Sequence, residues 1–169
     1  MNAPCDILLA EDDESDVFLI ERAFREVELP QRVSFVRDGQ EAIELLAGFE
    51  AVPDDRLPAL VILDMKMPRR SGVEVLRWIR AQRATRCIPV FMFSSSERRE
   101  DIEQAYAAGA NAFIVKPPSL DERREVARFI KQWLKLNRPP LAATEGSWAA
   151  ESMQDRWSAE IAGGGTEAR

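Results

Sequence analysis

Short apolar runs alternate along the chain with longer stretches in which apolar residues recur every three or four positions. The short runs are typical of β-strands that are buried on both faces of a sheet. The longer stretches indicate amphipathic helices, because residues three and four positions apart lie on one face of a helix. The expected strands cover residues 7–10, 33–36, 60–63, 90–93 and 112–115. The expected helices run from Ser15 to before Pro30, around residues 42–46, and over residues 72–81, 98–107 and 120–136.

The strict alternation of strands and helices predicts an α/β fold. A helix between consecutive strands allows a parallel sheet, and right-handed crossovers then place helices on both of its faces. For five such units, the compact doubly wound strand order is 2-1-3-4-5. This order predicts a ligand crevice at the carboxyl ends of the first and third strands, where the winding direction reverses.

A change in composition near Pro139 and Pro140 divides the chain. Residues 5–138 are expected to form the domain, and its last helix should turn its apolar side chains inward, namely Val126, Phe129, Ile130, Trp133 and Leu134. Residues 139–169 are rich in Ala, Gly, Ser, Thr and Glu, which predicts a disordered tail. The alternative is a short amphipathic helix, because apolar residues recur there at four-residue spacing, at Ala149, Met153, Trp157 and Ile161.

The overall composition excludes several classes of function. The formal net charge is −6 and the sequence pI is about 4.9, which argues against DNA as a partner because nucleic-acid surfaces gather Lys and Arg. The chain has 0 histidines, which excludes Ser-His-Asp and Cys-His catalysis and most zinc sites. No apolar run approaches the ~18 residues of a membrane span, and the start lacks a signal-peptide pattern, so no membrane association is expected.

The two cysteines, Cys5 and Cys87, form no CxxC pair, which fits a reducing, cytoplasmic location. Both precede expected strands, the first and the fourth, which lie two places apart in the predicted order. That separation is ~9.5 Å at ~4.8 Å per place, and a disulfide requires Cα atoms within ~7 Å. Both thiols are therefore expected to be free.

Carboxylates follow the two strands that border the predicted crevice. Glu11, Asp12 and Asp13 come directly after the first strand, and Asp64 follows the third. Converging carboxylates repel one another unless a cation lies between them. Oxygen ligands at a partly hydrated site suit Mg²⁺, so the sequence predicts a magnesium site here.

A hydroxyl and an ammonium group are expected at the same edge of the sheet. The fourth strand ends in Ser94, Ser95 and Ser96, and the fifth ends in Lys116 and Pro117. Together with a divalent cation, these groups indicate a site that handles an anion, because Lys116 and the metal stabilise negative charge while Ser94 donates a hydrogen bond.

Each of these residues also has an ordinary structural explanation. Acidic residues after a strand are often placed at a helix N-terminus, where the helix dipole favours them. One of the three serines from Ser94 to Ser96 is expected to cap the helix that follows. A lone Lys116 would be a solvated lysine, Phe113 would be a core residue, and Trp133 would pack in the core or lie at a subunit interface.

Taken jointly, these motifs resemble the receiver domain of two-component response regulators, a flavodoxin-like module. The resemblance covers roughly residues 5–138 and rests on four strand ends: Glu11 with Asp12, Asp64 through Pro68 with Gly72, Ser94, and Lys116 with Pro117. The chain looks most like the stand-alone regulators that accompany bacterial phytochromes.

The resemblance implies a role for each matching residue. Asp64 would be the phosphoacceptor and would bind Mg²⁺ with Asp12 and, through water, Glu11. The backbone carbonyl of Lys66 would be a further metal ligand. Lys116 would pair with the phosphoryl oxygens, Ser94 would be the switch hydroxyl, Phe113 would be the switch aromatic residue, and the bond before Pro117 would be a candidate cis peptide.

The function implied is a phosphorylation switch without enzymatic turnover of its own beyond self-catalysed phosphoryl transfer. A sensor histidine kinase, of phytochrome type by resemblance, would phosphorylate Asp64, and the face formed by the fourth helix, fifth strand and fifth helix would bind a protein partner. A homodimer is an open alternative to a monomer. One alternative is a phosphorelay intermediate or phosphate sink with no output of its own. A remoter alternative, a flavodoxin-type FMN protein, would need a phosphate-binding loop where Glu11 and Asp12 stand.

The chain departs from the family pattern at three positions. Lys66 stands two residues after the phosphoacceptor, where an uncharged or acidic residue is more usual, and predicts slow autodephosphorylation. Ser94 replaces the commoner Thr and keeps the hydroxyl group. Pro118 follows Pro117 and stiffens the exit from the last strand.

Overall fold

The computed structural model describes residues 7–48 and 57–137. Its strands are β1 (Ile7–Ala10), β2 (Val33–Val36), β3 (Leu60–Leu63), β4 (Val90–Ser94) and β5 (Ala112–Val115). Its helices are α1 (Glu14–Glu26), α2 (Gly39–Ala47), α3 (Gly72–Ala81), α4 (Arg99–Ala107) and α5 (Leu120–Leu136). The predicted alternation of strands and helices is confirmed, with boundaries that shift by up to three residues.

The strands form one parallel sheet in the order β2-β1-β3-β4-β5, which confirms the predicted fold. The register aligns Ala10 of β1 with Val36 of β2 and with Leu63 of β3. Because these paired residues end their strands, the residues that follow them emerge at the same edge of the sheet.

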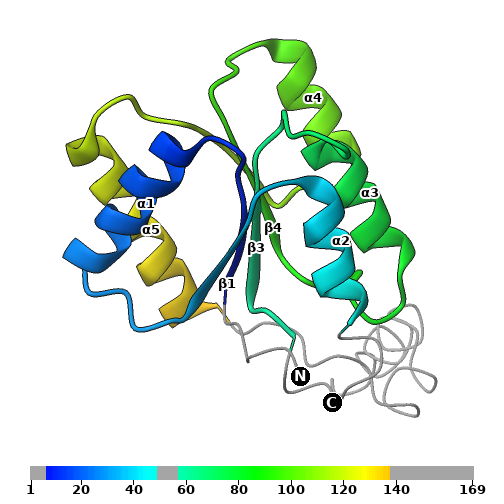
Figure 1. The fold of residues 1–169 in the computed structure, drawn as a ribbon, viewed down its shortest axis with the longest axis horizontal. Helices are drawn as coiled ribbons and strands as arrows, with labels where there is room; N and C mark the ends of the chain where they lie inside the picture. Colours follow the sequence, from blue (N-terminus) through cyan, green and yellow to red (C-terminus); the bar gives the residue numbers. More distant parts are fainter. Residues whose placement is uncertain (1–6, 49–56, 138–169) are drawn as a thin grey trace, which may run out of the picture.

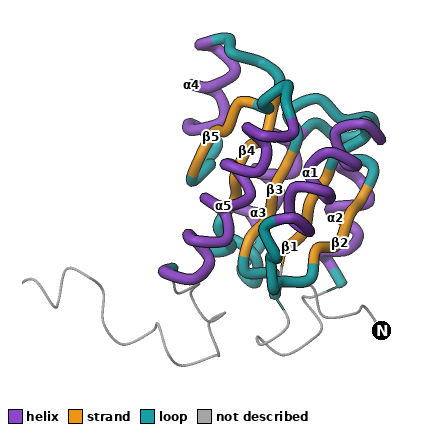
Figure 2. The backbone as a smooth tube through the Cα atoms, turned by 90° about the vertical axis from the view of Figure 1, so that its left-hand side faces the viewer, coloured by secondary structure: helices purple, strands orange, loops and turns teal. Residues whose placement is uncertain are grey.

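Helices cover both faces of this sheet, and each face has its own apolar core (Figure 1). Helices α1 and α5 lie together on one face, as Figure 2 shows from their side, where Ile7 and Leu9 of β1 contact them. Helices α2, α3 and α4 cover the other face, where Leu8 and Ala10 point. Strands β1, β3 and β4 are fully buried, in keeping with sequences that are continuously apolar except for Ser94 at the end of β4.

Side-chain caps set the start of two helices, one that begins earlier than predicted and one that begins where it was predicted. Helix α1 begins at Glu14, one residue early, because the Asp13 carboxylate accepts hydrogen bonds from the backbone N–H groups of Ser15 and Asp16. Helix α3 begins with a capping box in which Ser71 and Glu74 bond each other's backbone N–H groups. Its first residue must be glycine, since a Cβ atom on Gly72 would lie 2.0 Å from the carbonyl oxygen of Asp64.

The prediction for the inner face of α5 is wrong at Phe129. Ala127 and Ile130 are buried, whereas Phe129 is 49% exposed. Its ring still stacks on Phe91, with 6.0 Å between centroids, and Trp133 meets Phe91 edge-on at 5.0 Å. The reason is that consecutive residues lie ~100° apart around a helix, so Phe129 is displaced to one side of the buried face that Ala127 and Ile130 share.

Several expectations fall partly or wholly outside the described residues. Cys87 is free and exposed, as predicted, whereas Cys5 lies outside this range. The tail from residue 139, with its pattern from Ala149 to Ile161, lies outside it as well, so the domain boundary at residue 138 stays a prediction. Within the described part of the chain, every helix is too short or too polar to cross a membrane.

Candidate functional site

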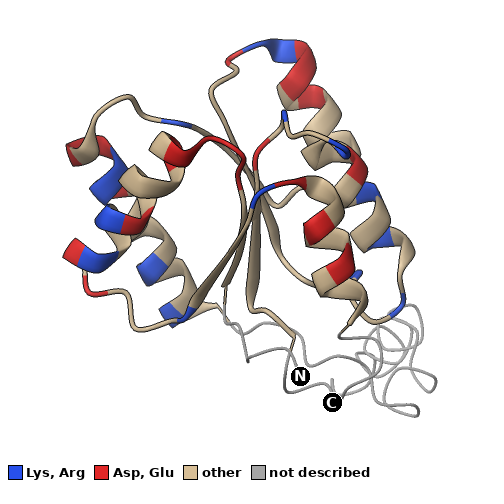
Figure 3. Cartoon of the chain, in the orientation of Figure 1, with Lys and Arg blue, Asp and Glu red and all other residues tan. Residues whose placement is uncertain are grey.

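Carboxylates gather at the carboxyl ends of β1 and β3 (Figure 3). The backbone places them there, because the N–H group of Glu11 donates to Val36 O (3.0 Å) and that of Asp64 donates to Ala10 O (3.0 Å). One carboxylate oxygen from each of Glu11, Asp12 and Asp64 lies within 4.8 Å of the others. Glu11 and Asp64 are buried and Asp12 is exposed, so the cluster opens to solvent on one side.

Lys116 points its ammonium group into this cluster. Its Nζ atom lies 2.6 Å from Glu11 Oε2, 2.9 Å from Asp64 Oδ1 and 2.9 Å from Asp16 Oδ2. Its backbone N–H donates to Ser94 O (2.8 Å), which extends the β4–β5 pairing and fixes where the side chain starts. The predicted convergence of the strand ends on one site is therefore confirmed for Glu11, Asp64 and Lys116.

The burial of these charges shifts their pKa values. Burial raises the pKa of Glu11 to about 7, and the nearby Lys116 ammonium only partly opposes this shift. For Lys116, burial alone would lower the pKa, but the carboxylates of Glu11, Asp16 and Asp64 outweigh it and hold the pKa above its ordinary value. The lysine therefore keeps its proton, whereas Glu11 can change its charge near neutral pH.

The donor set of the cluster fits a hard divalent cation. The Oε2 atom of Glu11 is buried and accepts no hydrogen bond of good geometry from the described residues. Its close neighbour is the ammonium group of Lys116. The three carboxylates provide more negative charge than Lys116 alone neutralises. Carboxylate oxygens beside open solvent are the ligands that Mg²⁺ prefers, because this ion keeps several of its waters.

The loop after Asp64 is held in place at both ends. The Lys66 N–H donates to Asp64 Oδ2 (2.7 Å), while the Lys66 side chain is exposed. Arg69, with φ at 61°, occupies the left-handed region that non-glycine residues rarely adopt. Its guanidinium binds Asp38 (Nε to Oδ2, 2.8 Å), and the other oxygen of Asp38 accepts from the backbone N–H groups that begin α2. The contact between Asp38 and Arg69 was not predicted from the sequence.

The two predicted switch residues lie on β4 and β5. Ser94 is buried at the end of β4, and its Oγ accepts a hydrogen bond from Ser96 N–H (3.1 Å). Phe113 is half-buried against the core under α4, and its N–H donates to Tyr106 Oη (3.2 Å). The expected serine cap of α4 takes a different form: Arg98 stands at the N-cap, and Ser96 Oγ bonds the Asp101 carboxylate and the Arg98 N–H.

The candidate cis peptide before Pro117 is not found. All peptide bonds between described residues are trans, including the bond between Lys116 and Pro117. The trans form is intrinsically favoured before proline by ~0.5–1 kcal/mol, so a cis bond requires surroundings that select it. The contact made here by Pro117, whose carbonyl oxygen accepts from Arg123 Nε at 2.8 Å, forms with the trans bond.

Sequence reasoning missed two charged residues beside the site. Asp16, in the first turn of α1, binds Lys116, and Arg123, in the first turn of α5, binds Asp16. Arg123 is only 3% exposed. One signal was available, since Arg123 shares its helix face with Ala127 and Ile130, and a charged residue on an apolar stripe needs a buried partner.

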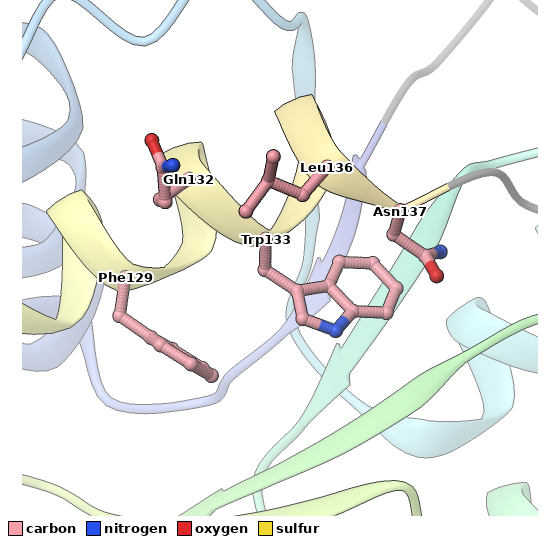
Figure 4. Close-up of a pocket in the computed structure, with 5 residues that line it drawn as sticks. All are labelled: Phe129, Gln132, Trp133, Leu136 and Asn137. Atoms are coloured by element: carbon pink, nitrogen blue, oxygen red, sulfur yellow. The ribbon is translucent and has the colours of Figure 1, made fainter.

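Two hollows lie on the side of the sheet covered by α1 and α5. One adjoins the acidic cluster and is lined by Glu11, Asp12, Phe18, Glu21 and Arg37, among others. The other lies at the far end of α5 and is lined by Phe129, Gln132, Trp133, Leu136 and Asn137 (Figure 4). The second hollow contains no titratable side chain, so the charged chemistry belongs to the first.

Comparison with known proteins identifies a family for this fold and site. The profile described as "Response regulator receiver domain" matches residues 7–128. A curated relative, "Probable methanogenesis regulatory protein FilR2" from Methanothrix harundinacea, is 35% identical over 138 residues, which is 81% of this chain and 88% of the relative.

Two solved structures are similar over most of their length. The phosphorylated cyanobacterial phytochrome response regulator RcpA is 30% identical with a TM-score of 0.70, and the match covers 79% of this chain and 96% of that one. The Mn(2+)-bound form of response regulator Rcp1, a protein of Synechocystis, is 27% identical with a TM-score of 0.70, and the match covers 81% and 99%.

Proposed function

This chain belongs to the response regulator receiver domain family, and from that premise we propose that it is a phosphorylation switch in which Asp64 accepts a phosphoryl group from the phosphohistidine of a sensor histidine kinase. The observation that carries the proposal is the position of Lys116 Nζ, which lies 2.9 Å from Asp64 Oδ1 and 2.6 Å from Glu11 Oε2. A buried ammonium at this distance can stabilise negative charge that is added to Asp64.

The proposed reaction is a direct transfer between two proteins. A carboxylate oxygen of Asp64 attacks phosphorus and forms an O–P bond. The N–P bond to the kinase histidine breaks, and the imidazole nitrogen leaves with the bonding electron pair. Such a transfer depends on positioning and charge neutralisation, and both conditions are met by groups with little freedom to move, since Asp64 and Lys116 are buried.

The Mg²⁺ ion required by this chemistry would be held by the carboxylates of Glu11, Asp12 and Asp64 and by the backbone carbonyl of Lys66. When bound, the ion neutralises charge on the phosphoryl oxygens during transfer. Its carboxylate donors are the cluster within 4.8 Å described above. The solved structure of Rcp1 is of its Mn(2+)-bound form, which supports a divalent ion in this chain as well.

The proposed switch turns this local charge into a change of surface. Ser94 Oγ would give up its contact with Ser96 N–H and donate to a phosphoryl oxygen, and Phe113 would move into the space that Ser94 leaves. The face of α4, β5 and α5 would then change its affinity for a protein partner. Moving a two-state equilibrium from 1:99 to 99:1 takes ~5.5 kcal/mol, and charge-assisted hydrogen bonds of ~1.5–3 kcal/mol each can supply it.

The partner that phosphorylates Asp64 is proposed to be a phytochrome-type kinase of the cytoplasm, because RcpA is a phytochrome response regulator. The test of the function itself does not depend on that partner. Incubation with acetyl phosphate and Mg²⁺ should add one phosphoryl mass that hydroxylamine removes, since hydroxylamine cleaves acyl phosphates. The mass gain should be absent in Asp64→Asn and retained in Asp121→Asn, a matched change at an exposed carboxylate. An equal gain in Asp64→Asn would contradict the proposal.

A further inference from the structure

Asp16 connects Lys116 to a second buried cation. Its Oδ2 atom accepts from Lys116 Nζ at 2.9 Å, and its Oδ1 atom binds the guanidinium of Arg123. Asp16 comes from α1, Lys116 follows β5 and Arg123 comes from α5, so the three charges join elements that lie 100 and 107 residues apart in the chain. Asp16 is neither the proposed phosphoacceptor nor one of the proposed metal ligands, so the proposed function gives it no role.

The surroundings of Arg123 fix the position of Asp16. The Arg123 side chain is only 4% exposed, Nε donates to Pro117 O at 2.8 Å, and a terminal nitrogen donates to the backbone oxygen of Asp16 at 3.3 Å. The guanidinium also lies 5.6 Å from the centre of the Phe93 ring. A buried guanidinium requires a counter-charge, and Asp16 is its carboxylate partner among the described residues.

The contacts of Lys116 show what Asp16 contributes. An ammonium group has three N–H donors, and Lys116 Nζ has three close carboxylates, on Glu11, Asp16 and Asp64. Glu11 and Asp64 belong to the metal and phosphoryl chemistry and must change their contacts during transfer. Asp16 lies outside the acidic cluster, and its second oxygen is already bound to Arg123, so it provides an anchor that the reaction does not disturb.

We propose that Asp16 is a positioning residue for phosphoryl transfer, which holds the Lys116 ammonium against Asp64 while Arg123 fixes Asp16. This inference rests on the proposed function, because it assigns the way in which the phosphoryl-binding lysine is oriented. If the inference holds, a variant without Asp16 should have a disordered Lys116 ammonium group and a slower phosphoryl transfer. Its affinity for Mg²⁺ should be unchanged.

The first measurement follows Lys116 directly. Proton–nitrogen NMR of lysine side chains detects ammonium groups that are held and protected from exchange. Wild-type protein should give such a signal for Lys116, which is assigned by its loss in Lys116→Arg and is thereby distinguished from any signal of Lys131, whose ammonium donates to Val27 O. The signal should broaden beyond detection in Asp16→Ala. The matched control is Glu26→Ala, which breaks a neighbouring α1–α5 ion pair, that of Glu26 with Arg124, without touching Lys116. The control should keep the signal.

The second measurement separates orientation from binding. With acetyl phosphate and Mg²⁺, Asp16→Ala should lower the rate constant at saturating donor about tenfold, and the half-saturating Mg²⁺ concentration should stay within about twofold. Asp16→Asn keeps the acceptor oxygen and should recover part of the rate. If Asp16→Ala does not fold, the same measurements are made on Asp16→Asn. Glu26→Ala should keep the wild-type rate.

Three results would overturn the inference: an unchanged Lys116 signal and rate in both Asp16 variants, an equal loss of rate in Glu26→Ala, or a loss that arises wholly from weaker Mg²⁺ binding. Failure of the proposed function would look different, since wild-type protein would then take up no phosphoryl group while the NMR signal of Lys116 would still depend on Asp16.

Discussion

Two cations at opposite ends of the sheet are withdrawn from water in different ways. At the carboxyl end, Lys116 is surrounded by the carboxylates of Glu11, Asp16 and Asp64. At the amino end, half-buried Arg80 donates to the backbone oxygens of three residues and to a side-chain amide, namely Arg86 O, Ile88 O, Gly109 O and Asn111 Oδ1. Among the described residues, all hydrogen-bond acceptors of Arg80 are neutral.

The difference in partners separates a structural cation, Arg80, from Lys116, the cation that we propose to be functional. Burial lowers the pKa of Arg80, whereas the carboxylates around Lys116 outweigh burial and hold its pKa above the ordinary value. Neutral carbonyls bind Arg80 in one geometry and tie the segments that precede β4 and β5 together. The carboxylates around Lys116, in contrast, are charged, and a bound metal ion or phosphoryl group would change their contacts. The groups that hold the lysine in place would therefore also hold it where negative charge is to be added.

The largest effect is expected at the carboxyl end. Lys116→Ala should lower the rate of phosphorylation by acetyl phosphate about 100-fold, the usual loss when one preorganised donor to developing negative charge is removed. Stopped-flow measurement at saturating Mg²⁺ checks the rate. Lys135→Ala, at an exposed position of α5, is the matched control and should leave the rate unchanged. A loss smaller than threefold in Lys116→Ala would contradict the central role of this lysine.

The second-largest effect is expected at the amino end of the sheet, where it should concern stability and not phosphorylation. Arg80→Ala should lower the free energy of unfolding by about 2–3 kcal/mol, because several partly buried carbonyl groups lose their donor. Its phosphorylation rate should stay within twofold of wild type, because Arg80 lies at the other end of the sheet. Urea denaturation and the acetyl phosphate assay check the two halves of this prediction. Arg77→Ala, at an exposed position of the same helix, should change neither quantity.

The smallest effect concerns an exposed cation close to the phosphoacceptor. The Lys66 side chain is exposed, while its backbone N–H holds Asp64 Oδ2 at 2.7 Å. An exposed ammonium near the acyl phosphate is expected to slow hydrolysis, so Lys66→Asn should speed phosphate loss about twofold to fivefold, the range of a surface ion pair. Lys66→Arg keeps the charge and should keep the slow rate. Decay of the phosphorylated mass with time measures both, and equal lifetimes in wild type and Lys66→Asn would refute this role.

Most of the fold and the centre of the site were predictable from the sequence. The apolar runs that precede Glu11 and Asp64 are strands, and the doubly wound order places both residues at one edge beside Lys116. This prediction succeeded because the relevant signals are local: a buried strand is continuously apolar, and the residue after it must emerge at the edge of the sheet.

Other features could not be predicted, because they depend on side-chain reach between distant segments. Nothing near Asp16 in the sequence indicates that it is shared by Lys116 and Arg123, which lie 100 and 107 residues away. The pairing of Asp38 with Arg69 spans 31 residues. Phe129 has the periodicity of a core residue, and only the packing of α5 shows that about half of its surface remains exposed.

The sequence by itself determined which residues end the strands and, through the handedness of the crossovers, that Glu11, Asp64 and Lys116 meet. The tertiary structure alone decided that a third carboxylate, on Asp16, completes the shell of Lys116, that Arg123 is buried behind it, and that the bond before Pro117 is trans. The physical reason is that strand ends follow from local patterns of burial, whereas the sharing of a buried charge depends on distances of a few ångströms between helices that only packing brings together.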